Sequence, residues 1–315
     1  MQATQSERKE QRNQKRGRER ILSPFPVLVI VLIGVLFGAS ASIFVRFSTA
    51  PALVLAAYRK TIVTFLLLPA VLLKFREELL HLEKKTVAWC ALSGCFLGIH
   101  FLTYFLAVQN TSIVATHVLG NTEVLFTAAF MFFTGKEQFG KQGILGIGIA
   151  IAGGLLVAWS GHNGESRMFG NLCGLGAAIT LAAYSLVGAK VRKNCSTTVY
   201  TFLVYGVSAL FLDLLVPLAG YSWVGYEPIN LLTAFCMAVL CSLMGHSVFN
   251  WALKYLSPTV ISMARLTSPV LAALLAFLLL RELPSWNQLL GGVIVLCGLY
   301  LYIQSKRQPA AAVQS

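Results

Sequence analysis

Long apolar stretches recur along the whole chain, separated by short segments that contain most of the polar and charged residues. Each stretch is about 20 residues long, the length of α-helix that crosses a ~30 Å hydrocarbon core. The stretches are apolar on every side, unlike the alternating strands of membrane barrels, so helices are expected. The pattern predicts ten transmembrane helices, over residues 26–46, 51–73, 87–108, 112–133, 142–160, 169–190, 197–218, 230–252, 257–279 and 286–303.

The composition places the protein in lipid. Of its 315 residues, 57% are hydrophobic and only 12% are charged, against about 25% charged in an ordinary soluble domain. A soluble globule, a disordered chain and a coiled-coil rod are excluded by the same numbers. We therefore expect an all-α integral membrane protein, with the lipid bilayer as its surroundings.

The 25 Lys and Arg residues lie mostly in the tails and in alternate loops. The basic tail 1–25 and the loop after the second helix are rich in them, whereas the opposite loops contain only Arg167 and Arg281. By the positive-inside rule, both termini are cytoplasmic, and we expect a multi-pass protein of the cytoplasmic (inner) membrane. The net charge of +13 is thus mainly an orientation signal, which is favoured over nucleic-acid binding; contact with anionic lipid is the alternative.

Motifs of metal binding and enzyme catalysis are missing from the sequence. The seven cysteines form no CxxC pair and have no metal-ligand spacing with histidine. No HExxH, GxSxG or nucleotide-binding loop is found, and no paired intramembrane aspartates. We expect no metal, no cofactor, no catalytic residue and no enzymatic activity, although an intramembrane enzyme and a channel are retained as rival classes.

An internal repeat organises the chain. Residues 107–154 align without a gap on residues 252–299, with nine identities at a constant offset of 145. A basic residue followed by Glu closes one helix in each half, as Lys136–Glu137 and as Arg281–Glu282. Five helices per half is an odd number, so the second half is inverted relative to the first, as in many secondary transporters. The expected organisation is a tail 1–25, a first repeat 26–160, a second repeat 169–303 and a cytoplasmic tail 304–315.

These features resemble the EamA-type members of the drug/metabolite transporter superfamily, over about residues 27–303. The resemblance rests on the two five-helix halves, on Pro51 followed by Tyr58–Arg59, and on the segment 257–301 with its Ser-Pro pairs, terminal Glu and Gly-rich last helix. One departure is Glu123–Val124, where the second half has Ser268–Pro269. The resemblance implies a secondary active transporter that works by alternating access, without a cofactor.

The substrate class follows partly from the resemblance and partly from the charges. The family exports or exchanges small metabolites, including amino acids, and some members in intracellular bacteria resemble exchangers (antiporters) of S-adenosylmethionine and S-adenosylhomocysteine. Acidic and basic groups that both lie deep in the helices favour a small amphoteric metabolite that is amino-acid-like or nucleoside-amino-acid-like. The sequence leaves open whether protons are the coupling ion and whether the protein is a homodimer.

Placing an ionisable group at bilayer depth costs at least ~2.5 kcal/mol, so we expect each such group to have a functional or structural role. Glu123, midway along the fourth helix, is the leading candidate for substrate binding or coupling: it could accept a substrate cation, carry a proton, or simply pair with Arg59 or Arg265. These two arginines could bind a substrate carboxylate. For Lys60 we expect an ion pair or a side chain that reaches the interface.

Polar residues at helical spacing supply the other candidates for the site. His117 and Asn121 share a face of the fourth helix because they are four residues apart. His100 and Tyr104 in the third helix and His246 and Asn250 in the eighth have the same spacing, and the repeat offset nearly superposes the two pairs. They could line a substrate path or form hydrogen bonds between helices.

Overall fold

The computed structural model describes residues 24–134, 140–159, 168–191, 195–252 and 264–305. The regular elements of this part of the chain are helices, and they form nine spans long and apolar enough to cross a membrane. Two of these spans, Ile113–Phe133 and Pro228–Gly245, each consist of two consecutive elements, and Ser268–Leu280 is a shorter apolar helix. The first half consists of α2 (Pro24–Phe47), α3 (Ala52–Lys74), α4 (Arg76–Leu80), α5 (Lys84–Asn110), α6 (Ile113–Asn121), α7 (Glu123–Phe133) and α8 (Lys141–Trp159). The second half consists of α9 (Met168–Val191), α10 (Thr197–Leu218), α11 (Pro228–Cys236), the π-helix η2 (Met237–His246), α12 (Ser247–Ala252), α14 (Ser268–Leu280) and α15 (Trp286–Ser305).

The predicted all-α membrane fold with ten helices in two inverted halves is confirmed, and the structure adds two local changes. The predicted helix 112–133 is interrupted at Thr122, which separates α6 from α7. The predicted helix 230–252 has a π-helical middle, where Ser242 Oγ donates to the carbonyl of Met237, five residues earlier. Of the predicted helix 257–279, the structure describes residues from 264 onward, and α14 begins at Ser268.

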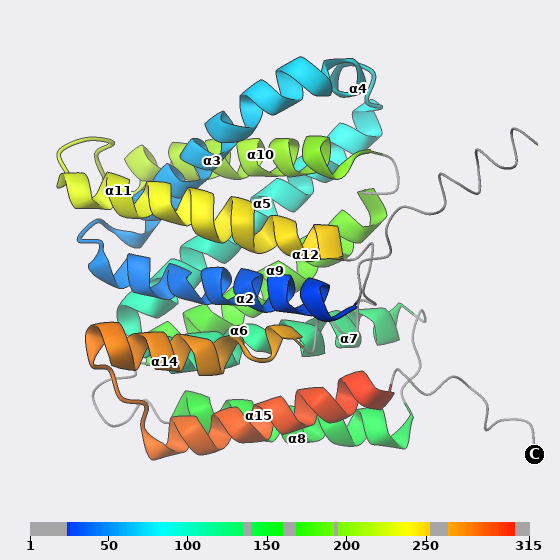
Figure 1. Cartoon of the computed structure of the whole chain (residues 1–315), viewed down its shortest axis with the longest axis vertical. Helices are drawn as coiled ribbons and strands as arrows, with labels where there is room; N and C mark the ends of the chain where they lie inside the picture. Colours follow the sequence, from blue (N-terminus) through cyan, green and yellow to red (C-terminus); the bar gives the residue numbers. More distant parts are fainter. Residues whose placement is uncertain (1–23, 135–139, 160–167, 192–194, 253–263, 306–315) are drawn as a thin grey trace, which may run out of the picture.

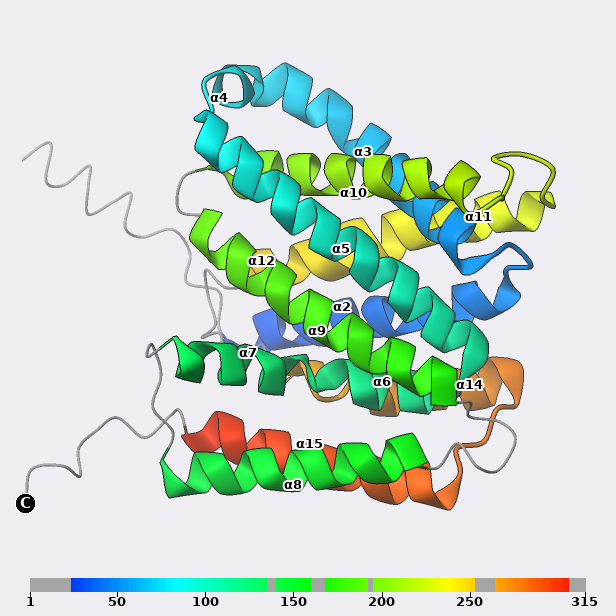
Figure 2. The same ribbon diagram turned by 180° about the vertical axis from the view of Figure 1, so that it is seen from behind.

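The inverted repeat is visible in how the helices pack. Three helices pack against their own repeat equivalents: α3 against α10, α6 against α14, and α8 against α15. Another contact has a repeat counterpart, since α5 packs on α9 as η2 packs on α2 (Figures 1 and 2). α2 begins and α15 ends at the same end of the bundle, which we call the terminal face, and α2 and α14 end at the opposite end, the far face (Figure 1).

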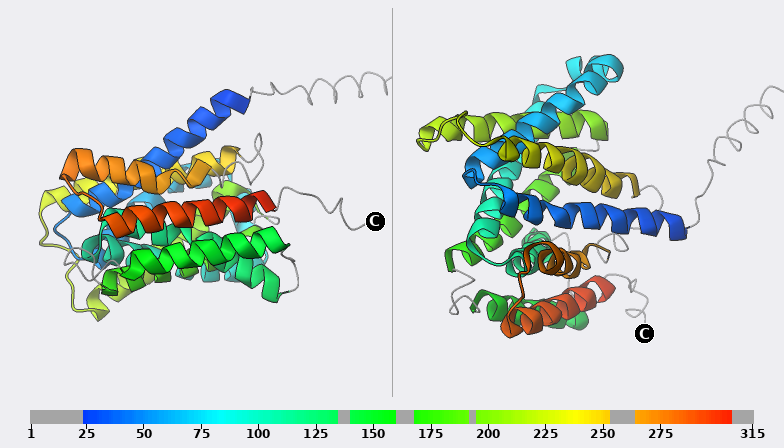
Figure 3. Two further views of the ribbon diagram at one scale, coloured as in Figure 1. Left: turned by 90° about the horizontal axis from the view of Figure 1, so that it is seen from below. Right: turned by 60° about the vertical axis from the view of Figure 1, so that its left-hand side comes forward.

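Glycines bring the backbones of α8 and α15 into direct contact at one side of the bundle (Figure 3). A Cβ atom on Gly146 would lie 2.7 Å from the carbonyl oxygen of Gly298, and one on Gly153 would lie 2.7 Å from that of Gly291. These four glycines are two repeat-equivalent pairs, since 146 and 291, and 153 and 298, differ by the offset of 145. Small residues let membrane helices approach closely where lipid provides no hydrophobic driving force.

A buried asparagine holds the connection between α2 and α3 in place at the far face. Asn230 Oδ1, on α11, accepts hydrogen bonds from Ser48 Oγ at 2.7 Å and from the backbone N–H groups of Thr49 and Ala50, both at 2.9 Å. Its Nδ2 donates to the carbonyl of Glu227 at 3.0 Å. One side chain therefore satisfies the backbone of a turn that belongs to the other half of the protein.

We expect Asn230→Ala to lower the free energy of unfolding by about 1–3 kcal/mol, because the buried N–H of Ala50 and the part-buried N–H of Thr49 lose the Oδ1 acceptor. Thermal unfolding of the purified protein in detergent measures the change. Leu231→Ala is the matched control, since it shortens a neighbouring side chain that is 55% exposed. Equal losses for the two variants would show that the hydrogen bonds of Asn230 contribute nothing of their own.

Candidate functional site

A cavity of ≈ 130 Å³ lies between the two halves of the protein. This is enough for several water molecules, each of which needs roughly 10–15 Å³ by the same kind of measure. The lining comes from α2, α3, α5 and α6 of the first half and from α9, η2, α12, α14 and Arg265 of the second. The lining residues are Val35, Gly38, Ala41, Arg59, His100, Phe101, Tyr104, Thr116, His117, Gly120, Asn121, Leu181, Cys241, Phe249, Arg265 and Ser268.

The cavity brings together six of the site residues predicted from the sequence. They come from four segments that are distant in the chain, and they are Arg59, His100, Tyr104, His117, Asn121 and Arg265. Two further candidates, His246 and Asn250, belong to η2 and α12, but their side chains lie outside the part of the structure that is described. The proposed superposition of these two on His100 and Tyr104 therefore stays a prediction.

Glu123, the leading candidate, lies beside the cavity lining and is engaged by protein groups. Its Oε2 lies 3.3 Å from Arg265 Nη2, and its Oε1 accepts a hydrogen bond from Ser185 Oγ at 2.9 Å. The Glu123 side chain is 11% exposed and that of Arg265 is 42% exposed. The ion pair joins the first half to the second, as in one of the two pairings considered from the sequence.

Both members of this pair lie next to equivalent interruptions of the helices. Thr122 ends α6, and its backbone N–H donates to the carbonyl of Leu119 at 3.1 Å. Thr267, its repeat equivalent, precedes α14 and donates in the same way to Ala264, also at 3.1 Å. Helices that are interrupted at corresponding positions of two inverted halves are a device of transporter substrate sites. The carboxylate of Glu123 also lies at the first residue of α7, where the helix dipole favours negative charge.

His117, in the cavity wall, connects α6 to three other helices. Its Nδ1 lies 3.1 Å from Ser268 Oγ, and its Nε2 lies 3.2 Å from Ser42 Oγ and 3.3 Å from Tyr104 Oη. The neighbouring His100 has its Nδ1 at 2.8 Å from the carbonyl of Ala177. Since a carbonyl only accepts, Nδ1 of His100 carries a proton and donates it. His100, Tyr104 and His117 thus line the cavity and also form hydrogen bonds between helices, and their place on a substrate path stays a prediction.

The expectation for Lys60 is wrong. Its side chain is fully buried and neither reaches the interface nor forms an ion pair within the described residues. Nζ lies instead 3.6 Å from the ring centroid of Phe101 and 4.1 Å from that of Tyr205. The reason is the arrangement of neighbouring helices, because the two rings come from α5 and α10 and enclose the ammonium group.

Several small polar residues of the site were missed from the sequence. Ser42 and Ser268 bind His117, and Ser242 accepts a hydrogen bond from Arg59 Nε at 3.1 Å. Serines occur throughout apolar helices, where most bind a carbonyl of their own helix. Ser268 carried one usable signal, its place beside Pro269 at the position equivalent to Glu123.

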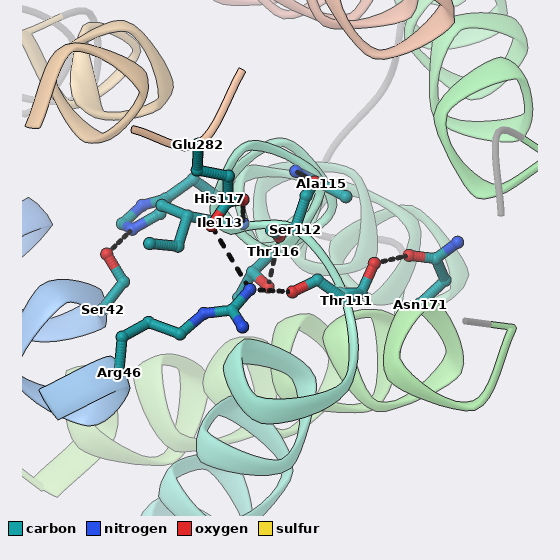
Figure 4. Close-up of polar contacts among 10 residues, drawn as sticks. All are labelled: Ser42, Arg46, Thr111, Ser112, Ile113, Ala115, Thr116, His117, Asn171 and Glu282. Carbon is teal, nitrogen blue, oxygen red and sulfur yellow. Dashed lines mark hydrogen bonds and ion pairs between the residues drawn. The ribbon is translucent and has the colours of Figure 1, made fainter. Parts of the chain in front are cut away.

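Polar contacts join the two halves near the end of α2 (Figure 4). Arg46 Nη2, at the end of α2, donates to the carbonyl of Thr111 at 2.8 Å and lies 3.4 Å from Glu282 Oε2. Glu282 Oε1 accepts from the backbone N–H of Ile113 at 2.8 Å. Thr111 in turn donates from Oγ1 to Asn171 Oδ1 at 2.8 Å. One ion pair thus holds together the ends of α2, α5, α6 and α14.

A bundle of two inverted halves with a polar cavity between them is typical of secondary transporters. The sequence profile of the EamA-like transporter family matches the chain twice, over residues 25–159 and over residues 168–304. The chain belongs to this family, and it is a multi-pass membrane protein.

Named relatives agree with this assignment at moderate sequence identity. A protein of Escherichia coli K12 named as a probable amino-acid metabolite efflux pump is 26% identical over 293 residues, which cover 88% of this chain and 93% of the relative. An uncharacterized transporter of Archaeoglobus fulgidus is 25% identical over 236 residues, 74% of this chain and 78% of the relative. A solved crystal structure superposes with a TM-score of 0.61 at 17% identity, over 90% of this chain and 99% of the other, which shows the shared fold.

Proposed function

We propose that this protein is a secondary active transporter that moves a small amphoteric metabolite across the cytoplasmic membrane by alternating access. The observation that carries the proposal is the cavity between the inverted halves, whose wall contains basic, imidazole, amide and hydroxyl groups from both. Groups of this kind are costly at bilayer depth and mark transport pathways. Both termini are cytoplasmic in this proposal, since the described basic residues Lys74, Lys84 and Lys141 belong to helix ends at the terminal face, where α3 ends and α5 and α8 begin.

The contacts at the far face support alternating access. Arg46 and Glu282 join the ends of helices from both halves on the side of the cavity toward residues 111–113. These contacts must break for the cavity to open there, and equivalent closure must form at the terminal face. Opening one end while the other is closed is what separates a transporter from a channel.

An amino-acid-like substrate is favoured by two observations. The E. coli relative is named for amino-acid metabolites, and the site holds an acid, Glu123, paired with Arg265, and a further base, Arg59, in the cavity wall. The alternative substrates are S-adenosylmethionine and S-adenosylhomocysteine in exchange. Protons as the coupling ion, with Glu123 as their carrier, and a homodimer as the assembly are further parts of the proposal.

Flux measurements on the purified protein in liposomes test the function. Labelled amino acids and S-adenosyl compounds are offered outside, with and without unlabelled compound inside. We expect uptake that saturates and that is accelerated at least fivefold by substrate on the opposite side. Flux that rises linearly with concentration and ignores the opposite side would identify a channel instead.

A further inference from the structure

Two adjacent cations on α3 are completely buried without a carboxylate. Arg59 is 1% exposed and Lys60 is 0% exposed. Within the described residues neither takes part in an ion pair, and Arg59 Nη1 and Lys60 Nζ have no hydrogen-bond partner. Burying a charge without a partner costs several kcal/mol, so a protein retains it only where something compensates.

Aromatic rings supply part of the compensation. The Arg59 guanidinium carbon lies 4.4 Å from the ring centroid of Phe101, the same ring that lies 3.6 Å from Lys60 Nζ. A cation–π contact stabilises a charge by less than the free energy that burying an unpaired charge costs. Tyr205 adds a ring 4.1 Å from Lys60 Nζ and Phe105 one 5.9 Å from Arg59, but no carboxylate among the described residues pairs with either cation.

The acid of the site is already engaged. Glu123 is bonded to Arg265 and to Ser185, so it neutralises Arg265 and leaves Arg59 and Lys60 unmatched. Asn121 adds a third unused donor, since its Nδ2 is buried without a partner. Both Arg59 and Asn121 line the cavity. Unsatisfied buried donors on one cavity require an occupant with acceptor atoms.

We propose that Arg59 and Asn121 form the anion-binding pole of the cavity and that the transported molecule must carry a carboxylate there. Lys60 strengthens the positive potential from behind Phe101 without touching the occupant. A planar carboxylate matches the edge of a guanidinium group better than it matches an ammonium. This proposal rests on the proposed function and narrows its substrate class to carboxylate-bearing metabolites, leaving out amines and lipophilic cations.

Matched ligands test the anion-binding pole. The full chain, purified in detergent, is titrated with each proteinogenic amino acid, with the corresponding amino-acid amide, which lacks the negative charge, and with the N-acetyl amino acid, which keeps it. Stabilisation against heating reports binding to the folded state. We expect the acids that bind to do so at least tenfold more tightly than their amides.

Substitutions of single arginines test whether Arg59 is the group that prefers the acid over the amide. Arg59→Gln is expected to weaken binding of the acid at least tenfold while leaving the affinity for the amide unchanged, and Arg59→Lys to recover part of the loss. Arg76→Gln, the same change at an exposed position on α4, should bind like the unaltered protein. If Arg59→Gln does not fold, the comparison of acid with amide on the unaltered protein still shows whether the site requires a carboxylate.

Two results would overturn the anion-binding pole. The first is that the amides bind as tightly as the corresponding acids. The second is that none of the carboxylate-bearing compounds tested stabilises the protein. Saturable flux of some other compound, accelerated from the opposite side, would then still support transport. If no compound showed saturable flux that is accelerated from the opposite side, the proposed function itself would be overturned.

Discussion

Gly146→Leu is expected to destabilise the protein by about 3 kcal/mol or more, because the added side chain has no space on α8. A Cβ atom at this position would lie 2.6 Å from the backbone nitrogen of Tyr302 and 2.7 Å from the carbonyl oxygen of Gly298. These are backbone atoms of α15, so the two helices would have to separate. The measurement is the midpoint of thermal unfolding, together with the yield of folded protein.

Gly148→Leu is the matched control on the same helix. A Cβ atom on Gly148 meets nothing within 4 Å, and the position is exposed. The same substitution two residues away should therefore change stability by no more than about 0.5 kcal/mol. If both variants unfolded at the same temperature, the close contact of α8 and α15 would not be a source of stability.

Glu123→Gln is expected to reduce flux at least tenfold. The amide keeps the size of the side chain but removes its charge, so that Arg265 loses its partner between the two halves. If Glu123 also carries the coupling proton, the flux that remains should no longer depend on pH. The measurement is substrate uptake into liposomes at a series of pH values.

Two further variants separate the roles of Glu123. The exchange Glu123→Arg with Arg265→Glu restores the pairing but moves the carboxylate, so recovery of flux would assign Glu123 to pairing alone. Glu77→Gln is the control, since that carboxylate lies on α4 and is 88% exposed. A Glu123→Gln protein with unchanged affinity and an unchanged pH profile would show that the residue is structural and does not take part in coupling.

The membrane fold was predictable because its causes are local. Each span has to be long and apolar by itself, and the offset of 145 residues relates the two halves directly in the sequence. The interruption at Thr122 and the π-helical segment 237–246 were not predictable. Helices that are apolar on every side have no periodicity from which a change of backbone hydrogen bonding could be inferred, so tertiary contacts decide it.

The charged and imidazole side chains of the site could be predicted from the sequence, whereas its small hydroxyl residues could not. Arg59, His117 and Arg265 stand out because a charged or imidazole group in an apolar run is retained only where it has a function or a bonding partner. Their partners Ser42, Ser242 and Ser268 can be placed in any helix at little free-energy cost, so their presence in an apolar run does not indicate a site. The surroundings of Lys60 depend on rings from two other helices, and the partnership of Arg46 with Glu282 joins positions far apart in the chain.

The glycine contact of α8 with α15 has a consequence for the motion itself. When two inverted halves exchange conformations, the contact of α5 with α9 takes on the geometry of its counterpart, η2 with α2, and the reverse. The contact of Gly146 with Gly298 maps onto that of Gly291 with Gly153, which already has the same close geometry. In the proposed alternating access this interface would therefore keep its geometry, and we expect α8 and α15 to stay in contact while other helices move.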